Sequence, residues 1–395
     1  MKSWLNKNII GFCSASFFGD WCHEMGTAIL PMFITQLVSG TYAPFALGFI
    51  QGFADAGATI TKLLSGYLAD RVPFYKPFLI AGYGISGVCL ALIGTVQSII
   101  FIFVYKTIAW LAKGIREPMR DTWIAKIVPR NLYGRVFGLQ RSLDTLGALV
   151  GPLTTFFLLK INFSLTSVFL FSAIPAIFSV LSIMFLTHEE KRETMVMHDV
   201  HFIEQVKVLP SDFISFAWIM FLFGVGNFNQ TLLIYRVQEI FGQEHSFLIA
   251  TTHGVLLYAF FNVIRAFSEF GMGTLSDYVN RKMLLAVFGF GAFGITTLGF
   301  MVHVTPIWFW LLCFGCAGLS AGTVKALEKA HASYILPEQT RGVGLGLLQS
   351  IDGVGDLLSS LIVGALWSFI SPLAGLIYAA IISFIAMVLL IFQRD

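Results

Sequence analysis

The sequence predicts an all-α integral membrane protein with about twelve transmembrane helices in two pseudo-symmetric halves of six. Three observations point to this class. Of the 395 residues, 56% are hydrophobic and only 12% are charged, whereas a soluble domain carries about 25% charged residues. The apolar residues form runs long enough to cross a bilayer, which takes about 20 residues of helix. The third observation is an internal repeat that relates the two halves.

The apolar runs are separated by short breaks that contain charged residues, Pro or Gly. Each run has the length of one membrane-spanning helix. The first six expected spans lie near residues 8–38, 43–69, 77–96, 98–128, 134–160 and 164–187. The other six lie near residues 212–240, 246–276, 283–302, 305–336, 340–370 and 373–393.

Lys and Arg residues collect on one side of this arrangement, while the opposite loops carry almost none beyond Lys160. By the positive-inside rule, both termini and the long polar loop 188–210 face the cytoplasm. We therefore expect an N-terminal half over residues 1–187, a cytoplasmic linker over 188–210 and a C-terminal half over 211–395. The protein is then a multi-pass protein of the inner or plasma membrane.

An internal repeat supports the two halves. Residues 66–72 (GYLADRV) align with residues 273–279 (GTLSDYV) at a constant shift of 207. Farther along, five residues of the first half match five of the second at a shift of 208: Pro129, Gly134, Gly138, Asp144 and Gly147 match Pro337, Gly342, Gly346, Asp352 and Gly355. Such a duplication in parallel orientation predicts a solute site near the midplane, between halves that rock against each other.

The first expected span carries three ionisable residues, Asp20, His23 and Glu24, in the middle of an otherwise apolar run. Their spacing of i, i+3 and i+4 places them on one face of a helix. A charge near the bilayer centre costs roughly 2.5 to 3.5 kcal/mol on insertion scales, so such groups face a water-filled cavity or partners. The trio therefore predicts a transport pathway. Asp20 and Glu24 are the expected proton-binding groups, and His23 is expected to relay protons or bind solute.

The loop after the second span, Gly66-x-Leu68-Ala69-Asp70-Arg71, resembles the signature loop of the major facilitator superfamily (MFS), and a weaker copy occupies residues 273–282. This resemblance covers essentially the whole chain and implies the MFS fold. Three further segments are similar to a bacterial branch whose solutes are mostly unassigned: Asp20-x-x-x-Glu24-Met25, residues 113–121 (KGIREPMRD) and residues 137–145 (FGLQRSLDT).

The resemblance also implies roles for individual residues. Asp70, with Arg71, would latch the two halves on the cytoplasmic side, and Asp277 is the matching residue of the second half. Lys106 occupies a position where the superfamily often has an Arg linked to proton movement. The stretch Gly147-x-x-x-Gly151-Pro152 resembles the antiporter motif, although Thr154 and Thr155 replace its usual trailing glycines.

Charged residues crowd the cytoplasmic part of the fourth span. They are Lys113, Arg116, Glu117, Arg120 and Asp121. At the 208 shift, Glu117 corresponds to Lys325 and Arg120 to Glu328, so the charges are exchanged between the halves. Opposite charges at symmetry-related positions predict an inner gate that closes across the pseudo-twofold axis. Most of these groups are expected to form structural ion pairs rather than to bind solute.

Further ionisable residues lie within other spans. Asp55, Arg141, Asp144 and Asp352 are candidates for the proton or solute pathway, and Arg141 and Asp144 are one turn apart. The five cysteines all fall in apolar runs, where a free thiol behaves as a small hydrophobic group. We expect no disulfide framework, no cofactor and no resident metal.

The predicted function is a secondary active transporter that moves a small solute by alternating access, coupled to protons and working by antiport. Its partners are then the solute, protons and the lipid bilayer, with no nucleic acid, and the protein is expected to be a monomer and not an enzyme. No Gly-rich loop with Lys-Ser/Thr is present, which disfavours a transporter driven by ATP.

Three alternatives remain open at this stage. A transition-metal transporter would use Asp20, His23 and Glu24 as ligands, because His and carboxylate suit such metals. A carrier of siderophores or other organic anions would use Arg116, Arg120 or Arg141. A receptor or scaffold that transports nothing would show no solute flux in proteoliposomes.

The predicted topology is tested by introducing a cysteine at position 195, in the long polar loop. In intact cells, Met195→Cys is expected to escape a membrane-impermeant thiol reagent and to react once the membrane is opened. A cysteine at position 161, in the loop that follows Lys160, serves as the externally labelled control. Labelling of position 195 from outside would contradict the topology.

Overall fold

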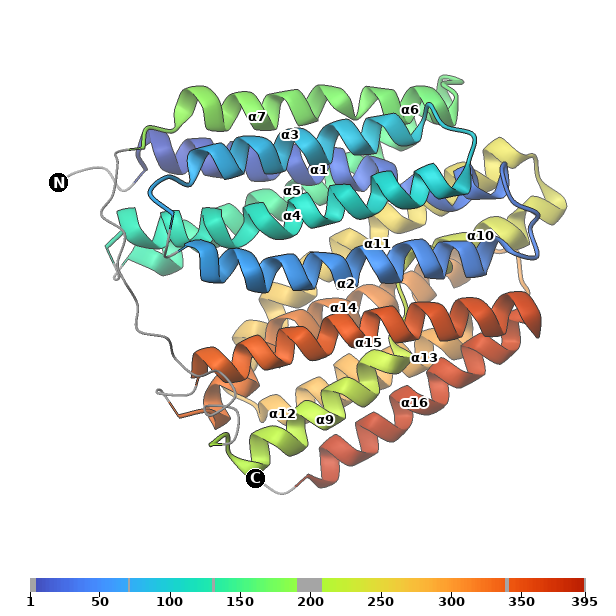
Figure 1. Ribbon diagram of the computed structural model, residues 1–395. Coiled ribbons are helices and arrows are strands. Elements are labelled where there is room, and N and C mark those ends of the chain that lie inside the picture. The colour runs from blue at the N-terminus through green and yellow to red at the C-terminus, as the bar shows by residue number, and fades with distance from the viewer. Residues whose placement is uncertain (1–4, 70–71, 130–131, 190–207, 338–340, 394–395) are drawn as a thin grey trace. The chain divides into compact units, whose positions relative to one another are not determined.

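The computed structural model describes residues 5–69, 72–129, 132–189, 208–337 and 341–393. Within these ranges the protein consists of helices and their connections, with no strand (Figure 1). The first six spans are α1 (Lys7–Thr35), α2 (Ala43–Ala69), α3 (Lys76–Ile93), α4 (Ile99–Ile127), α5 (Tyr133–Lys160), and α6 (Leu165–Phe171) followed by α7 (Ala173–Leu186). These bounds agree closely with the six spans that hydropathy predicts.

The second six spans begin with α9 (Ser211–Gly226) and α10 (Thr231–Glu244), which form one span, and α11 (Phe247–Leu275). The ninth span joins α12 (Arg281–Leu284), the π-helical segment η2 (Leu285–Gly291) and α13 (Ala292–Gly299). The last three are α14 (Ile307–Ile335), α15 (Arg341–Phe369) and α16 (Pro372–Phe392). Twelve spans are therefore confirmed in the described part of the chain.

Nine of the described helical segments are long and apolar enough to cross a bilayer by length and composition alone. The spans α1, α2 and α4 do not meet this criterion. Each of them carries ionisable side chains inside the helix, which lowers its mean hydropathy. Many of the charged residues that point to function thus lie in α1, α2 and α4 of the N-terminal half.

The seventh span is broken, where the sequence pattern predicts one continuous helix. Helix α9 ends at Gly226, and α10 begins at Thr231. The Asn229 side chain accepts a hydrogen bond from the Thr231 backbone N–H at 3.0 Å, and the Ser359 hydroxyl donates to the Asn227 carbonyl at 3.2 Å. Polar side chains therefore satisfy backbone groups that the break frees, as non-helical backbone at membrane depth requires.

The chain forms two compact units. Unit 1 comprises residues Met1–Phe33 and Phe53–His198, and unit 2 comprises Ile34–Gly52 and Asp199–Asp395. Helix α2 thus contributes its first ten residues to unit 2. There, the Phe45 backbone N–H donates to the Ser368 hydroxyl at 2.9 Å, and Tyr235 donates to the Gly40 carbonyl at 2.9 Å.

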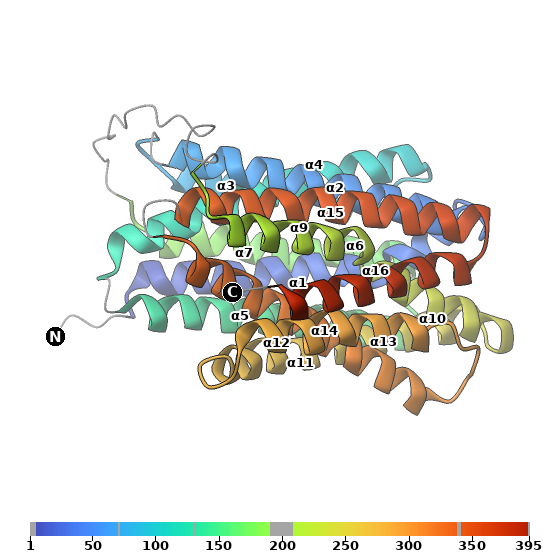
Figure 2. The same cartoon turned by 90° about the horizontal axis from the view of Figure 1, so that it is seen from below.

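Within unit 1, α3 packs against both α4 and α7 (Figure 1). The core of unit 1 includes an aromatic cluster, where the Phe12 and Trp123 ring centroids are 4.8 Å apart and Tyr75 and Tyr83 are buried. Within unit 2, α9, α15 and α16 lie side by side in both ribbon views (Figures 1 and 2), and α14 packs against α11.

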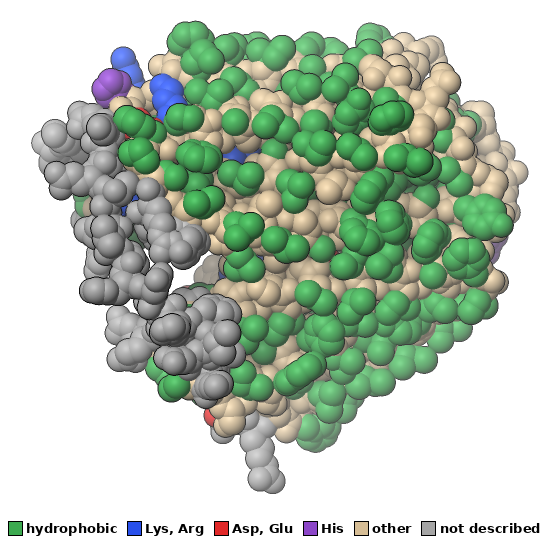
Figure 3. All heavy atoms as spheres, viewed as in Figure 1, with side chains coloured by type: hydrophobic (Ala, Val, Ile, Leu, Met, Phe, Trp, Pro, Cys, Tyr) green, Lys and Arg blue, Asp and Glu red, His purple; other side chains and the backbone are tan. Residues whose placement is uncertain are grey.

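The outer surface of the helices is strongly apolar. Hydrophobic side chains are spread over the whole described part of the face seen in Figure 3, and few charged side chains appear on it. Large apolar residues are exposed at several places, including Phe157 at 60%, Trp218 at 67% and Phe270 at 79%. A surface of this kind suits contact with lipid rather than with water.

The internal repeat also appears in the packing of the helices. In unit 1, Gly114 on α4 lies against α2, where an added Cβ would come within 2.5 Å of the Ala58 carbonyl oxygen. In unit 2, Gly322 on α14 lies against α11, where an added Cβ would come within 2.7 Å of the Ser268 Cβ. Gly114 and Gly322 differ by 208 positions, so the repeat has kept the same close approach of two helices.

This contact predicts matched effects in the two halves. Gly114→Val and Gly322→Val are each expected to destabilise the protein by about 1 to 3 kcal/mol, because the added side chain overpacks a close helix contact. Gly138→Ala and Gly346→Ala, which have open space around the added Cβ, are the controls. The thermal midpoint of the detergent-purified protein is the measurement. A valine variant with an unchanged midpoint would contradict the packing argument.

Candidate functional site

A network of ion pairs joins α1, α2 and α4 inside unit 1. Lys113 on α4 lies 3.7 Å from Asp20 on α1 and 3.9 Å from Glu117 on its own helix. Lys62 on α2 approaches Glu117 to 2.8 Å. Two residues from the predicted gate, Lys113 and Glu117, therefore pair with groups on neighbouring helices of the same unit. The predicted proton site at Asp20 is directly connected to them.

His23 lies beside this network, against the side chain of Trp110 on α4. The two ring centroids are 5.0 Å apart in an edge-to-face arrangement, and His23 is only 2% exposed. Neither of its ring nitrogens has a hydrogen-bond partner among the described residues. Buried polar atoms are normally hydrogen-bonded. A polar solute or a water molecule could therefore form hydrogen bonds with the two ring nitrogens of His23.

Trp110 also connects two more of the predicted residues. Its indole N–H donates to Asp55 on α2 at 2.8 Å, and the Lys106 ammonium lies over the indole ring at 3.4 Å from its centroid. Lys106 is 1% exposed, and its Nζ has no hydrogen-bond partner among the described residues. The cation is held by the ring face instead. Trp110 is thus the centre of a site that includes His23, Asp55 and Lys106.

A second buried cluster surrounds Arg120 on α4. Its guanidinium donates to the Ser16 hydroxyl on α1 at 2.6 Å and lies 3.8 Å from Asp144 on α5. Gln140 donates to Asp144 at 2.6 Å and to Ser16 at 3.2 Å. This cluster joins three helices through charge-assisted hydrogen bonds, which are the stronger kind.

Two exposed charges border the Arg120 cluster. Asp121 lies 3.0 Å from the Arg120 guanidinium, and Arg141 lies 3.9 Å from Asp144. The pairing of Arg141 with Asp144 that their spacing allows is therefore present.

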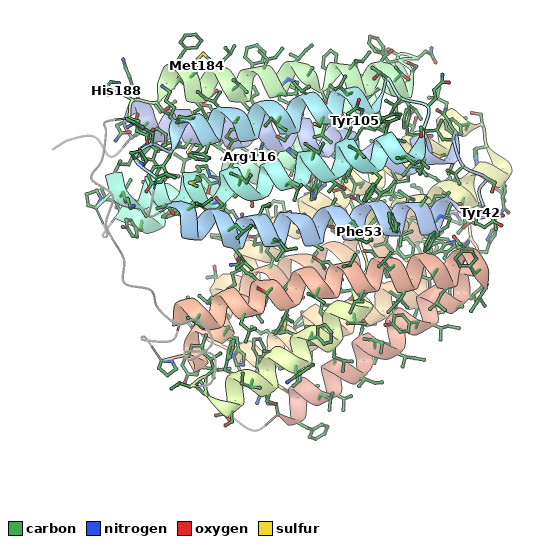
Figure 4. The ribbon with its side chains drawn as sticks, viewed as in Figure 1. Tyr42, Phe53, Tyr105, Arg116, Met184 and His188 are labelled. Atoms are coloured by element: carbon green, nitrogen blue, oxygen red, sulfur yellow. The ribbon has the colours of Figure 1, made fainter. Side chains whose placement is uncertain are left out.

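Arg116, labelled on α4 in Figure 4, is directed toward α3. Its guanidinium carbon lies 4.0 Å from the centroid of the Tyr83 ring, and it donates to the Ser86 hydroxyl at 3.0 Å. The residue is 3% exposed, and its Nε has no hydrogen-bond partner among the described residues. An aromatic ring and a hydroxyl therefore hold this cation, in contrast to the carboxylates around Arg120.

Two glycines of the fifth span, α5, allow it to lie close against the first span, α1. An added Cβ at Gly151 would come within 2.8 Å of the Trp21 carbonyl oxygen and 2.9 Å of the Glu24 Cβ, and Gly147 faces the backbone of Phe17 in the same way. Pro152 lies inside the helix. The Thr155 hydroxyl donates to the Met25 carbonyl at 3.4 Å. These contacts at Gly147 and Gly151, called the seam below, place α5 directly against the stretch of α1 that carries Asp20, His23 and Glu24.

The predicted residues of the C-terminal half pair within unit 2. Lys325 on α14 lies 4.0 Å from Glu269 on α11, and Asp277, in the connection after α11, lies 3.5 Å from Arg281 at the start of α12. Glu328 on α14 and Asp352 on α15 lie within hydrogen-bonding reach of each other. Asp70 and Arg71, the residues of the predicted latch, lie outside the described residues.

Several residues of these clusters were not expected from the sequence: Trp110, Lys62, Ser16 and Gln140. One signal was present, because Lys106, Trp110, Lys113 and Glu117 recur at helical spacing on one face of α4. Nothing in a single sequence indicates that Ser16 or Lys62 would lie opposite that face.

The trio Asp20, His23 and Glu24 does not form a metal-ligand set. Among the described residues, no group of three or more His, Cys, Asp or Glu side chains is arranged to hold a metal ion. Asp20 faces Lys113, and His23 faces Trp110. In this structure, the side chains of Asp20 and His23 therefore contact different partners on α4.

Twelve helical spans, with ion pairs that join helices inside unit 1, define a polytopic membrane protein. A family model described as Major Facilitator Superfamily matches residues 15–267 and 214–395. The chain is also 30% identical, over 392 residues, to an uncharacterized MFS-type transporter of Methanocaldococcus jannaschii, with 98% of this chain and 95% of the relative covered. The chain belongs to the Major Facilitator Superfamily.

Solved structures agree on the fold. A mutant of the nucleoside transporter NupG matches with a TM-score of 0.79 at 13% identity, covering 99% of this chain and 100% of that one. A D-xylose-proton symporter matches with a TM-score of 0.72 at 16% identity, covering 98% and 97%. At these identities the likeness shows the fold alone.

The Arg120 cluster predicts unequal effects of its two acids. Asp144→Asn is expected to destabilise the protein by about 1 to 3 kcal/mol, because it removes a charge that compensates a buried guanidinium. Asp121→Asn is expected to cost less than about 1 kcal/mol: its pair with Arg120 is shorter, but its side chain is 47% exposed and screened. Thermal midpoints of the purified proteins compare the two. Equal losses would contradict the importance of burial here.

Proposed function

We propose that this protein is a proton-coupled secondary transporter that exchanges a small polar solute for protons by alternating access. Membership of the superfamily supports solute transport. The observation that carries the finer proposal is the cluster around Trp110, where the His23 ring nitrogens and the Lys106 ammonium are buried without hydrogen-bond partners among the described residues. A polar solute that reaches this cluster would satisfy these atoms.

The Asp20–Lys113 pair supports proton coupling. Both side chains are only partly exposed, at 23% and 22%, so their attraction is weakly screened compared with a surface pair. A proton on Asp20 cancels its charge and releases Lys113 toward Glu117. Proton binding thus rearranges the same helix face that carries Trp110, which is the requirement for coupling a proton to a solute.

The packing of α5 on α1 supports exchange over cotransport. The seam at Gly147 and Gly151 lies directly behind Trp21 and Glu24, and its sequence resembles the antiporter motif of the superfamily. In the proposed exchange, the solute and the proton compete for the α1–α4 network, so that binding of one favours release of the other. Export is the direction that this motif favours.

An organic anion is the second candidate solute. Arg116 favours it, because this buried guanidinium has no carboxylate within ion-pair distance among the described residues and its Nε lacks a hydrogen-bond partner. Arg120 does not favour it, since Asp121 and Asp144 already pair with it.

The proposal also includes placement in the cell. We propose that the protein works as a monomer in the inner or plasma membrane, with both termini in the cytoplasm. The Lys and Arg asymmetry of the loops supports this orientation.

The proton role of the first span is tested with isosteric amides. Asp20→Asn and Glu24→Gln are each expected to abolish solute movement driven by a pH gradient while the protein stays folded, because an amide keeps size and hydrogen bonding but cannot titrate. The solute is first found by thermal shift against nucleosides, pentoses, peptides, siderophores, drugs and metal ions. Proton flux is then followed with a pH dye in proteoliposomes.

Glu244→Gln, an exposed carboxylate at the end of α10, is the matched control and is expected to retain coupling. His23→Ala is expected to weaken solute binding about 5- to 10-fold through loss of one buried hydrogen bond, and to leave proton coupling intact. Full coupling in both the Asp20 and Glu24 variants would overturn the proposal. Loss of manganese, iron(II) or zinc binding in His23→Ala would support a metal transporter instead.

A further inference from the structure

Two carboxyl groups of unit 2 lie in contact where unit 1 has an ion pair. Glu328 on α14 and Asp352 on α15 are within hydrogen-bonding reach of each other. At the repeat shift of 208 they correspond to Arg120 and Asp144, whose charged groups lie 3.8 Å apart in unit 1. The second half has therefore kept the acid on the eleventh span and replaced its basic partner with another acid.

The surroundings of the acid pair have also changed. In unit 1, Gln140 donates a hydrogen bond to Asp144. The corresponding residue of unit 2 is Leu348, which is fully buried and has no polar group to donate. Glu328 is 7% exposed, and its Oε1 has no hydrogen-bond partner among the described residues. The partners that compensate the acid in unit 1 are thus absent from the equivalent positions.

The other charged groups near the Glu328–Asp352 pair do not take the place of Arg120 and Gln140. Lys329 follows Glu328 directly on α14 and attracts both carboxyl groups, but it is exposed, so solvent screens its charge. On α15, Asp356 lies one turn beyond Asp352 and adds a further negative charge near Glu328. Lys325, one turn before Glu328, pairs with Glu269 on α11. Helix α9 faces this region with the apolar side chain of Phe216, which packs against His331.

An ionised carboxylate only accepts hydrogen bonds, so two carboxylates cannot bond to each other unless one carries a proton. Two like charges in contact inside a membrane span are strongly disfavoured, and a shared proton removes one of them. We propose that Glu328 and Asp352 form a proton-binding site in which the two carboxyl groups share one proton.

This inference extends the proposed proton coupling, since it places a proton-binding site in the C-terminal half in addition to Asp20 and Glu24 in the N-terminal half. Loss of the shared proton would leave two adjacent negative charges on α14 and α15. The resulting repulsion acts between the tenth and eleventh spans, whose contact a transport cycle would then reorganise. Protonation of the pair is a property of the resting protein and does not require a solute.

The test is infrared spectroscopy of the purified protein in lipid at pH 7, with no solute added. The wild type is expected to show the C=O stretching band of a protonated, hydrogen-bonded carboxylic acid, shifted on exchange into D2O. Glu328→Gln and Asp352→Asn are each expected to remove it. Glu328→Arg, which copies the basic partner of unit 1, is expected to remove it while an ion pair to Asp352 holds the helices together.

Asp212→Asn, an exposed acid at the start of α9, is the matched control and is expected to keep the band. A band that persists in all three variants of the pair would overturn the proposal. Loss of the wild-type band when sodium chloride replaces choline chloride would also overturn it, by identifying a metal cation between the carboxylates. Because the measurement involves no transport, it stands or fails separately from the coupling role of Asp20 and Glu24.

Discussion

The cost of placing charge inside a membrane span governs the interior of this protein. On α1, α2, α4 and α5, most of the charged groups described above meet that cost through an opposite charge, a hydrogen-bonding side chain or an aromatic face. Lys113 lies between Asp20 and Glu117, and Arg120 lies between Ser16 and Asp144. Lys106 relies on the Trp110 ring instead. A change in protonation anywhere in this network alters the pairing of its neighbours.

Close packing of helices makes these contacts possible. Gly114 brings α4 against α2, and Gly151 brings α5 against the stretch of α1 that holds Glu24. Between helices of a bilayer, small residues allow backbones to approach and side chains to meet at short range. The glycines thus set the distances at which the ionisable groups interact, and the chemistry of the site depends on them.

The duplication has preserved the scaffold and changed the chemistry. Gly114 and Gly322 make equivalent contacts in the two units, while Arg120 in one unit corresponds to Glu328 in the other. The N-terminal half therefore concentrates ion pairs, and the C-terminal half contains a pair of acids in contact. In the proposed proton coupling, this divergence gives each half its own set of ionisable groups within one fold.

The sequence alone determined the number and approximate bounds of the spans, the repeat and the position of Asp20, His23 and Glu24 in the middle of the first span. These follow from hydropathy and helical period, which are local properties of the chain. It also determined the superfamily, through the loop at residues 66–71. Only the tertiary structure decided that Trp110 links His23, Asp55 and Lys106, and that the seventh span breaks at Asn227. Periodicity places a residue on a face of its own helix, but the rotation and approach of the neighbouring helices decide which side chains that face meets.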